Sequence, residues 1–277
     1  MRIKIFSSFC GEDHAKKSME ALITPYLAIN YGDVKKTYGE NTDFIYIVPQ
    51  GDSSYTHVVI WNTAMPSIPN HIPKKNVIGL AFEPIVYLKL TPQFVDYAQK
   101  NIQTYYIGDA EGLPKPFEEG NAYLPYNSPR PTIPFKSNVM SMVLSNKKAL
   151  FGHKYRHQLL KYILHHRLPI DVFGHGVSKN WYQNCYSENI KGPFERYEPY
   201  ESYLFSISIE NTDSNHYFGE KVINPLLSSC VPIYWGCRNI NKYFPEKTIK
   251  LTGDIVTDMN LLLHILQSPW DYHKKIN

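Results

Sequence analysis

A short polar stretch in the C-terminal half of the chain concentrates residues that could bind an anion. Residues 203–209 alternate like a strand, and a helix is predicted from 217 to 228. The first turn of a helix carries unpaired backbone N–H groups and the positive end of a dipole, which suits a phosphate. Lys221 follows in the first turns of this helix and adds a full positive charge. The pattern therefore predicts a phosphorylated ligand.

Glu220, directly beside Lys221, narrows the class of ligand. A carboxylate would repel a simple phosphate, but it accepts hydrogen bonds from ribose hydroxyls, as the acidic residue of dinucleotide folds does. Asn211 at the carboxyl end of the strand and Tyr217 at the start of the helix complete the candidate set. These residues indicate a nucleoside diphosphate with an exposed sugar. The competing interpretation is that Glu220 and Lys221 form a solvated helix face and that Tyr217 is a packing residue.

Strands and helices alternate in both halves of the chain, which predicts an α/β fold with parallel sheets covered on both faces. Strands are predicted at residues 2–6, 43–48, 57–61, 77–82, 104–108, 139–145, 170–174, 203–209, 231–235 and 248–251. Helices are predicted at residues 13–28, 92–100, 152–166, 217–228 and 257–267. Because prolines crowd residues 111–137, we expect two domains, residues 1–135 and 136–277.

Composition excludes several classes of protein. Of the 277 residues, 43% are hydrophobic and 19% are charged, which is typical of a globular protein. The net charge of +4 is not gathered in a Lys/Arg stripe, so a nucleic-acid binder is not expected. We find neither a signal peptide nor an apolar run of the ~18 residues that a membrane span needs. The four cysteines match no zinc or disulfide pattern. We therefore expect a cytoplasmic protein whose membrane contact is at most peripheral.

Three motifs together resemble glycosyltransferase family 10, the alpha-1,3-fucosyltransferase family. "IENT", "YFGEK" and "VPIYWG" follow the order and spacing of its donor-binding motif, with Ile209 in place of the usual Phe and Gly219 in place of the usual Thr. "VLSNKKALFGHKYRHQLLKYI" is similar to the segment whose arginine contacts the donor pyrophosphate, here Arg156. "GLAFEPIVY" is similar to the motif that holds the general base, here Glu83. Independently, a carboxylate at the end of an apolar strand suits a base, although surface acids are common at such positions.

The resemblance implies a GT-B fold, in which two Rossmann-like domains face a cleft. The first domain would bind a glycan acceptor and the second a nucleotide sugar, and the final helix is a candidate to cross back to the first domain. The implied reaction is transfer of L-fucose from GDP-fucose to a glycan hydroxyl with inversion, with Glu83 as the base. No cofactor and no metal ion are expected. Donor binding is assigned to Arg156, Asn211, Tyr217, Glu220 and Lys221.

Three alternatives remain open at this stage. The enzyme could use another GDP-hexose, because no residue reads the fucose methyl group. A GT-B enzyme that uses a UDP-sugar is the second alternative, and a catalytically silent carbohydrate-binding protein is the third. The presence of Glu83 together with Glu220 and Lys221 argues against the third, since a pure binder needs no base. The acceptor glycan and the linkage are not encoded in any motif that we recognise.

Overall fold

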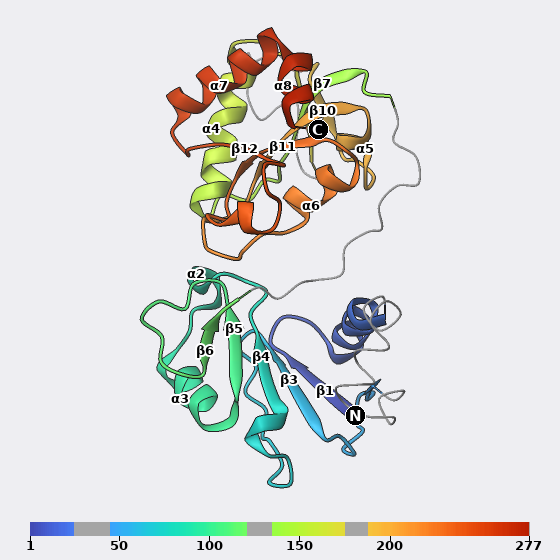
Figure 1. Ribbon diagram of the computed structural model, residues 1–277, viewed down its shortest axis with the longest axis vertical. Helices are drawn as coiled ribbons and strands as arrows, with labels where there is room; N and C mark the ends of the chain where they lie inside the picture. The colour runs from blue at the N-terminus through green and yellow to red at the C-terminus, as the bar shows by residue number, and fades with distance from the viewer. Residues whose placement is uncertain (25–44, 121–134, 175–187, 277) are drawn as a thin grey trace. The chain divides into compact units, whose positions relative to one another are not determined.

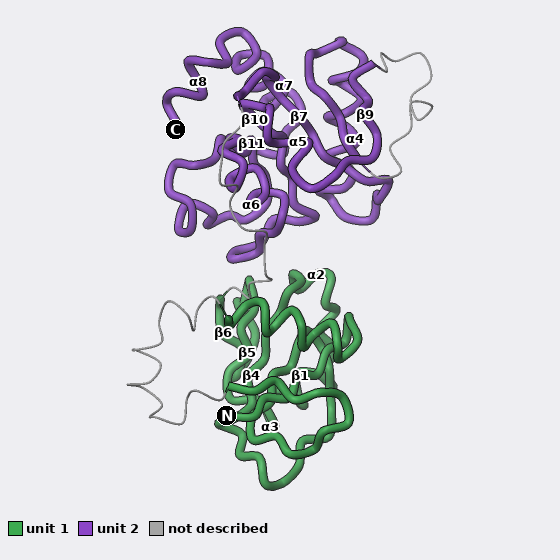
Figure 2. The backbone as a smooth tube through the Cα atoms, turned by 90° about the vertical axis from the view of Figure 1, so that its right-hand side faces the viewer, with its two compact units in different colours: residues 1–125 green, residues 126–277 purple. Residues whose placement is uncertain are grey.

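The computed structural model describes residues 1–24, 45–120, 135–174 and 188–276. The chain divides into two compact units, residues 1–125 and 126–277 (Figures 1 and 2). The division falls somewhat earlier in the chain than the expected boundary between residues 135 and 136. Each unit contains one six-stranded sheet in which all neighbouring strands are parallel. The predicted α/β class with parallel sheets is thus confirmed.

The sheet of unit 1 has the strand order β2-β1-β3-β4-β5-β6. Its strands are β1 (Arg2–Ser7), β2 (Tyr46–Ile47), β3 (His57–Trp61), β4 (Val77–Leu80), β5 (Thr104–Ile107) and β6 (Phe117–Glu119). Its helices include η2 (Lys74–Asn76), α2 (Ile85–Leu88), α3 (Pro92–Asn101) and a helical stretch over 12–24. The expected helix over 13–28 continues into residues outside those described. Helix α3 begins as predicted, because Thr91 caps it by accepting the Phe94 N–H at 3.2 Å.

The sheet of unit 2 has the order β12-β11-β10-β7-β8-β9. Its strands are β7 (Asn138–Val143), β8 (Ile170–Phe173), β9 (Ile190–Gly192), β10 (Tyr203–Ile209), β11 (Val231–Trp235) and β12 (Ile249–Lys250). Its helices are α4 (Phe151–His165), α5 (Glu198–Glu201), α6 (Glu220–Leu227), η4 (Ile240–Lys242), α7 (Ile255–Gln267) and α8 (Pro269–Ile276). Strand β10 is buried along its whole length, as expected for a central strand of a parallel sheet.

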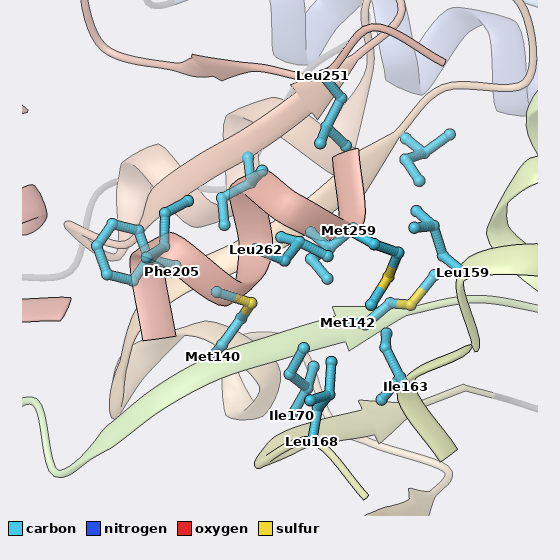
Figure 3. Close-up of a cluster of buried hydrophobic side chains, with 14 of the residues drawn as sticks. Met140, Met142, Leu159, Ile163, Leu168, Ile170, Phe205, Leu251, Met259 and Leu262 are labelled. Atoms are coloured by element: carbon cyan, nitrogen blue, oxygen red, sulfur yellow. The ribbon is translucent and has the colours of Figure 1, made fainter. Parts of the chain in front are cut away.

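The core of unit 2 lies between its sheet and helices α4 and α7. Met142 of β7 packs in one apolar cluster with Leu159 of α4 and with Met259 and Leu262 of α7 (Figure 3). Helix α8 packs on β10. The burial of apolar surface holds such layers together and contributes about 25 cal/mol per Å². This packing fixes α4 beside the carboxyl end of β10, where the polar residues lie.

Four of the described elements, β6, β9, α5 and α6, differ from the predictions. Strand β6 lies inside the proline-rich stretch that was expected to be a linker, and β9 and α5 lie in a stretch that was not assigned regular structure. Helix α6 begins at Glu220 instead of at residue 217, because Gly219 before it has an extended backbone and is the N-cap; the Gly219 N–H donates to Glu210 Oε1 at 2.8 Å. Within the described residues, no helix is long and apolar enough to cross a membrane.

Candidate functional site

Helix α4 comes unusually close to the carboxyl end of β10. The Gly152 N–H in its first turn donates to the Asn211 carbonyl oxygen at 3.0 Å. A Cβ atom at Gly152 would lie 1.9 Å from the Glu210 carbonyl oxygen, so only glycine fits there. The Glu210 N–H in turn donates to the Trp235 carbonyl oxygen at 2.8 Å, which joins the ends of β10 and β11. The site is therefore built where two central strands end, the usual ligand position in such sheets.

Glu210 is the buried centre of this arrangement. Its side chain is fully buried, and its Oε1 accepts the Gly219 N–H at 2.8 Å. Its Oε2 lies 3.2 Å from the Lys221 Nζ. Burial raises the pKa of Glu210, and the Lys221 ammonium partly opposes this shift. The sequence places Glu210 at the end of the strand but not among the ligand residues, and its role as the anchor of both the loop and Lys221 was missed.

Lys221 lies between two carboxylates. Its Nζ is 2.8 Å from Glu220 Oε1 as well as 3.2 Å from Glu210 Oε2. Burial alone would lower the pKa of Lys221, but the two carboxylates outweigh it and the pKa is raised. Lys221 is therefore a cation at neutral pH. The Glu220 side chain is 61% exposed, so this carboxylate faces solvent while Glu210 does not.

Arg156 of α4 is buried beside the same loop. Its Nη2 donates to Asn211 Oδ1 at 2.7 Å, and its Nε donates to the Gly152 carbonyl oxygen at 3.2 Å. Burial lowers the pKa of Arg156, and the neighbouring Glu210 and Glu220 carboxylates oppose the shift. A guanidinium stays charged at any ordinary pH, so Arg156 is a second cation held in place at the site.

His153, one turn before Arg156, was not recognised from the sequence. Its Nδ1 accepts the Leu150 N–H at 3.1 Å, which caps the first turn of α4. Burial, with the nearby positive charge of Arg156, lowers the pKa of His153 to about 4. His153 is therefore neutral at neutral pH and serves to hold the helix start. The signal in the sequence is the position of His153, three residues after the N-cap Leu150, where a side chain can bond back to the N-cap N–H.

The structure brings the five predicted donor residues together in unit 2. Arg156 contacts Asn211 directly, and Glu220 contacts Lys221. Tyr217 is half-buried in the loop before α6, and its phenol is near enough to Arg156 to affect the pKa of the guanidinium. The alternative interpretation, a solvated helix face, does not fit Lys221, whose side chain is only 21% exposed.

Glu83 lies in unit 1, at the carboxyl end of its own sheet. It follows β4 by three residues and is half-buried, and Pro84 after it caps the short helix α2. The preceding residue, Phe82, is fixed by its N–H, which donates to Asn62 Oδ1 at 2.9 Å. Its ring meets the Trp61 ring edge-on at 4.7 Å. The position of Glu83 at a strand end is as expected, and its role as a base stays a prediction.

Cys10, Cys230 and Cys237 are free thiols, and burial raises the pKa of Cys230 to about 12. No group of three or more His, Cys, Asp or Glu side chains within the described ranges is arranged to hold a metal ion.

Comparisons with known proteins agree with this geometry. A family model described as glycosyltransferase family 10 (fucosyltransferase) C-terminal matches residues 133–266. A candidate fucosyltransferase of Acanthamoeba polyphaga mimivirus is 37% identical over 68 residues, which are 24% of this chain and 11% of the viral protein. A candidate fucosyltransferase-like protein of Arabidopsis thaliana is 25% identical over 129 residues, which are 45% of this chain and 23% of the plant protein. The chain thus spans less than a quarter of the length of either relative.

Solved structures are similar over the whole chain. A crystal structure of an alpha1,3-fucosyltransferase has a TM-score of 0.60 and 14% identity, and the match covers 100% of this chain and 80% of that chain. An alpha1,3-fucosyltransferase with GDP-fucose has a TM-score of 0.58 and 13% identity at the same coverage. The predicted GT-B class, with two Rossmann-like units, is confirmed by this likeness. The C-terminal unit is thus similar to glycosyltransferase family 10, the fucosyltransferase family, over residues 133–266.

Proposed function

We propose that this protein is a glycosyltransferase that transfers fucose from GDP-fucose to a hydroxyl group of a glycan. The observation that carries the proposal is the enclosed cation pair of unit 2. Arg156 and Lys221 are both held by buried or half-buried partners at the carboxyl end of β10. This pair lies within the segment that the fucosyltransferase family model matches.

The chemistry of the leaving group explains why two fixed cations are useful. When the sugar departs, negative charge develops on the diphosphate, and pre-positioned donors stabilise it without reorganising. Arg156 can donate two parallel hydrogen bonds to phosphate oxygens, and Lys221 supplies a point charge. The exposed carboxylate of Glu220 is the natural acceptor for ribose hydroxyls. Asn211 and Tyr217 would line the donor pocket from the loop between β10 and α6.

The acceptor side of the reaction is assigned to unit 1. Inversion at the anomeric carbon requires a base that takes the acceptor proton as the new bond forms. We propose Glu83 for this role, because it follows the carboxyl end of β4 and its neighbours Phe82 and Pro84 hold its backbone. The two cations of unit 2 would neutralise the diphosphate, and we therefore propose that transfer proceeds without an added metal ion.

A transfer assay tests this proposal. GDP release from GDP-fucose is measured with a panel of oligosaccharides that end in galactose or N-acetylglucosamine, with and without EDTA. Glu83→Gln should lower the transfer rate about 10²–10⁴-fold and leave GDP affinity within a factor of two. Glu111→Gln, at an exposed carboxylate of the same unit, is the control and should retain full activity. Full activity of Glu83→Gln would refute the base assignment, and loss of activity in EDTA would refute metal independence.

A further inference from the structure

The loop that joins β10 to α6 contains a residue with a constrained backbone. His216 has φ of 57°, in the left-handed region that residues other than glycine rarely adopt. Such a conformation is unfavourable for an L-residue and persists only when surrounding contacts determine it. His216 directly precedes Tyr217, one of the predicted donor residues. The contacts of its side chain therefore need an explanation.

Hydrogen bonds to Asn239 and Tyr243 hold His216. Its backbone N–H donates to Asn239 Oδ1 at 2.8 Å. Its ring Nε2 lies 3.0 Å from Asn239 Nδ2, and its ring Nδ1 contacts the Tyr243 hydroxyl. Asn239 Oδ1 also accepts from Cys237 Sγ at 3.0 Å. The backbone and both ring nitrogens of one buried residue are thus tied to the segment that follows β11.

These contacts determine where the ring proton lies. Asn239 Oδ1 accepts from the His216 N–H and from Cys237 Sγ, which fixes the orientation of the amide. The amide atom that faces the His216 ring is therefore Nδ2, a donor. His216 Nε2 must therefore be the unprotonated acceptor, and the proton sits on Nδ1 and is donated to the Tyr243 hydroxyl. The tautomer that is protonated at Nδ1 satisfies these contacts. A shorter side chain could reach Asn239 or Tyr243, but not both.

The loop is held at a second point three residues later. Gly219 N–H donates to Glu210 Oε1 at 2.8 Å, as described above. Between the two points, the Phe218 ring packs against the Tyr243 ring at 4.7 Å. Tyr217 is therefore confined between one anchor on Glu210 and another on Asn239 and Tyr243.

We propose that His216 is a positioning residue for the donor site, which fixes Tyr217 and the start of α6 for nucleotide binding. The proposal rests on the nucleotide-binding function proposed above. It assigns His216 no contact with the ligand. Its effect passes through the loop backbone, so that GDP binding depends on the hydrogen bonds that join His216 to Asn239 and Tyr243.

Calorimetric titration of GDP into the full chain tests the proposal, with a melting temperature measured for each variant. His216→Asn introduces a residue that tolerates the left-handed backbone, but its shorter side chain cannot reach both Asn239 and Tyr243. Tyr243→Phe removes one hydroxyl and keeps the ring against Phe218. We expect His216→Asn to raise the Kd for GDP about tenfold and Tyr243→Phe to raise it about threefold. These changes are the size expected from the net contribution of the hydrogen bonds that each variant loses. The double variant should bind GDP with the same Kd as His216→Asn alone, because both substitutions break the same connection between the loop and Tyr243.

A matched control separates positioning from general stability. The Tyr203 hydroxyl donates to Asp171 Oδ2 at 2.7 Å. Tyr203 is the first residue of β10, at the end of the strand opposite to the donor site. Tyr203→Phe should lower the melting temperature and leave the Kd for GDP within a factor of two. An unchanged Kd in His216→Asn, or an equal loss of affinity in Tyr203→Phe, would overturn the inference alone. A wild-type chain that does not bind GDP would overturn the proposed function and this inference with it.

Discussion

The Glu210 carboxylate and the Lys221 ammonium lie 3.2 Å apart, and the carboxylate of this pair is fully buried. Glu210 belongs to the end of the central strand β10, and Lys221 belongs to the first turn of α6. The pair therefore joins the strand to the helix through charge as well as through the Gly219 N–H. A ligand that binds beside Lys221 meets a cation whose position is set by the sheet itself.

Replacing Lys221 by methionine should destabilise the protein by about 3 kcal/mol, because it leaves Glu210 buried without its counter-charge. Lys154→Met, at an exposed lysine of α4, is the control and should change stability by less than about 0.5 kcal/mol. Urea unfolding at pH 7 measures both variants. Equal stability of the two variants would contradict the account.

The same pair predicts a dependence on alkaline pH. The folded-state pKa of Lys221 is raised above its usual value of about 10.4, so its contribution is fully present below that pH. It is lost as the pH rises through the folded-state pKa. The wild-type free energy of unfolding should therefore fall more steeply above pH ~10.4 than that of Lys221→Met. Parallel curves for the two proteins would rule out this coupling.

Gly152 should tolerate no side chain. An added Cβ atom would lie 1.9 Å from the Glu210 carbonyl oxygen and 2.9 Å from that of Asn211, so α4 or the end of β10 must move. Gly152→Ala should cost about 3 kcal/mol or more of stability and should weaken GDP binding. Gly11→Ala, where the added atom meets nothing within 4 Å, is the control. A Gly152→Ala protein with wild-type stability would show that the approach of α4 is not as close as described.

His153 predicts a loss of stability on the acid side. Its pKa is about 4 in the folded protein and about 6.5 in an unfolded chain, so the unfolded state binds more protons between these values. Stability should fall as the pH drops from about 6.5 to about 4. His153→Asn keeps an acceptor for the Leu150 N–H but does not titrate, so its stability should change less across this window. Thermal unfolding from pH 7 to pH 4 compares the two, and identical acid limbs would count against the assignment.

Arg156 should determine the preference for a diphosphate. Arg156→Lys keeps the charge but loses the planar fork that can bond two phosphate oxygens. We expect the Kd for GDP to rise about tenfold while that for GMP rises less, which reduces the ratio between them. Fluorescence or calorimetric titrations with both nucleotides measure this ratio. A preserved ratio would place the β-phosphate elsewhere.

The sequence predicted the central strands well, because each is a short apolar run that stays buried on both faces. Strands β10 and β11 begin and end at the predicted residues, 203–209 and 231–235. The five donor residues converge because they lie beyond the carboxyl end of β10 or on the helices beside it. In a parallel sheet the carboxyl ends of all strands meet on one side.

Other features depend on contacts that no local pattern contains. The residue before α6, Gly219, is held by the Glu210 side chain. The anchoring of His216 depends on Asn239 and Tyr243, which lie more than twenty residues away. Strand β6 is only Phe117–Glu119 and exists because it pairs with β5. Such short elements carry little periodicity, and tertiary contacts decide them.

Calorimetric titration of GDP and UDP into the wild-type chain and into Lys221→Ala decides whether Lys221 binds the donor nucleotide. We expect that GDP binds, that UDP binds at least tenfold more weakly, and that Lys221→Ala loses most of the GDP affinity. Tight binding of UDP in place of GDP would contradict the assignment of the donor. Wild-type GDP affinity in Lys221→Ala would contradict the site itself.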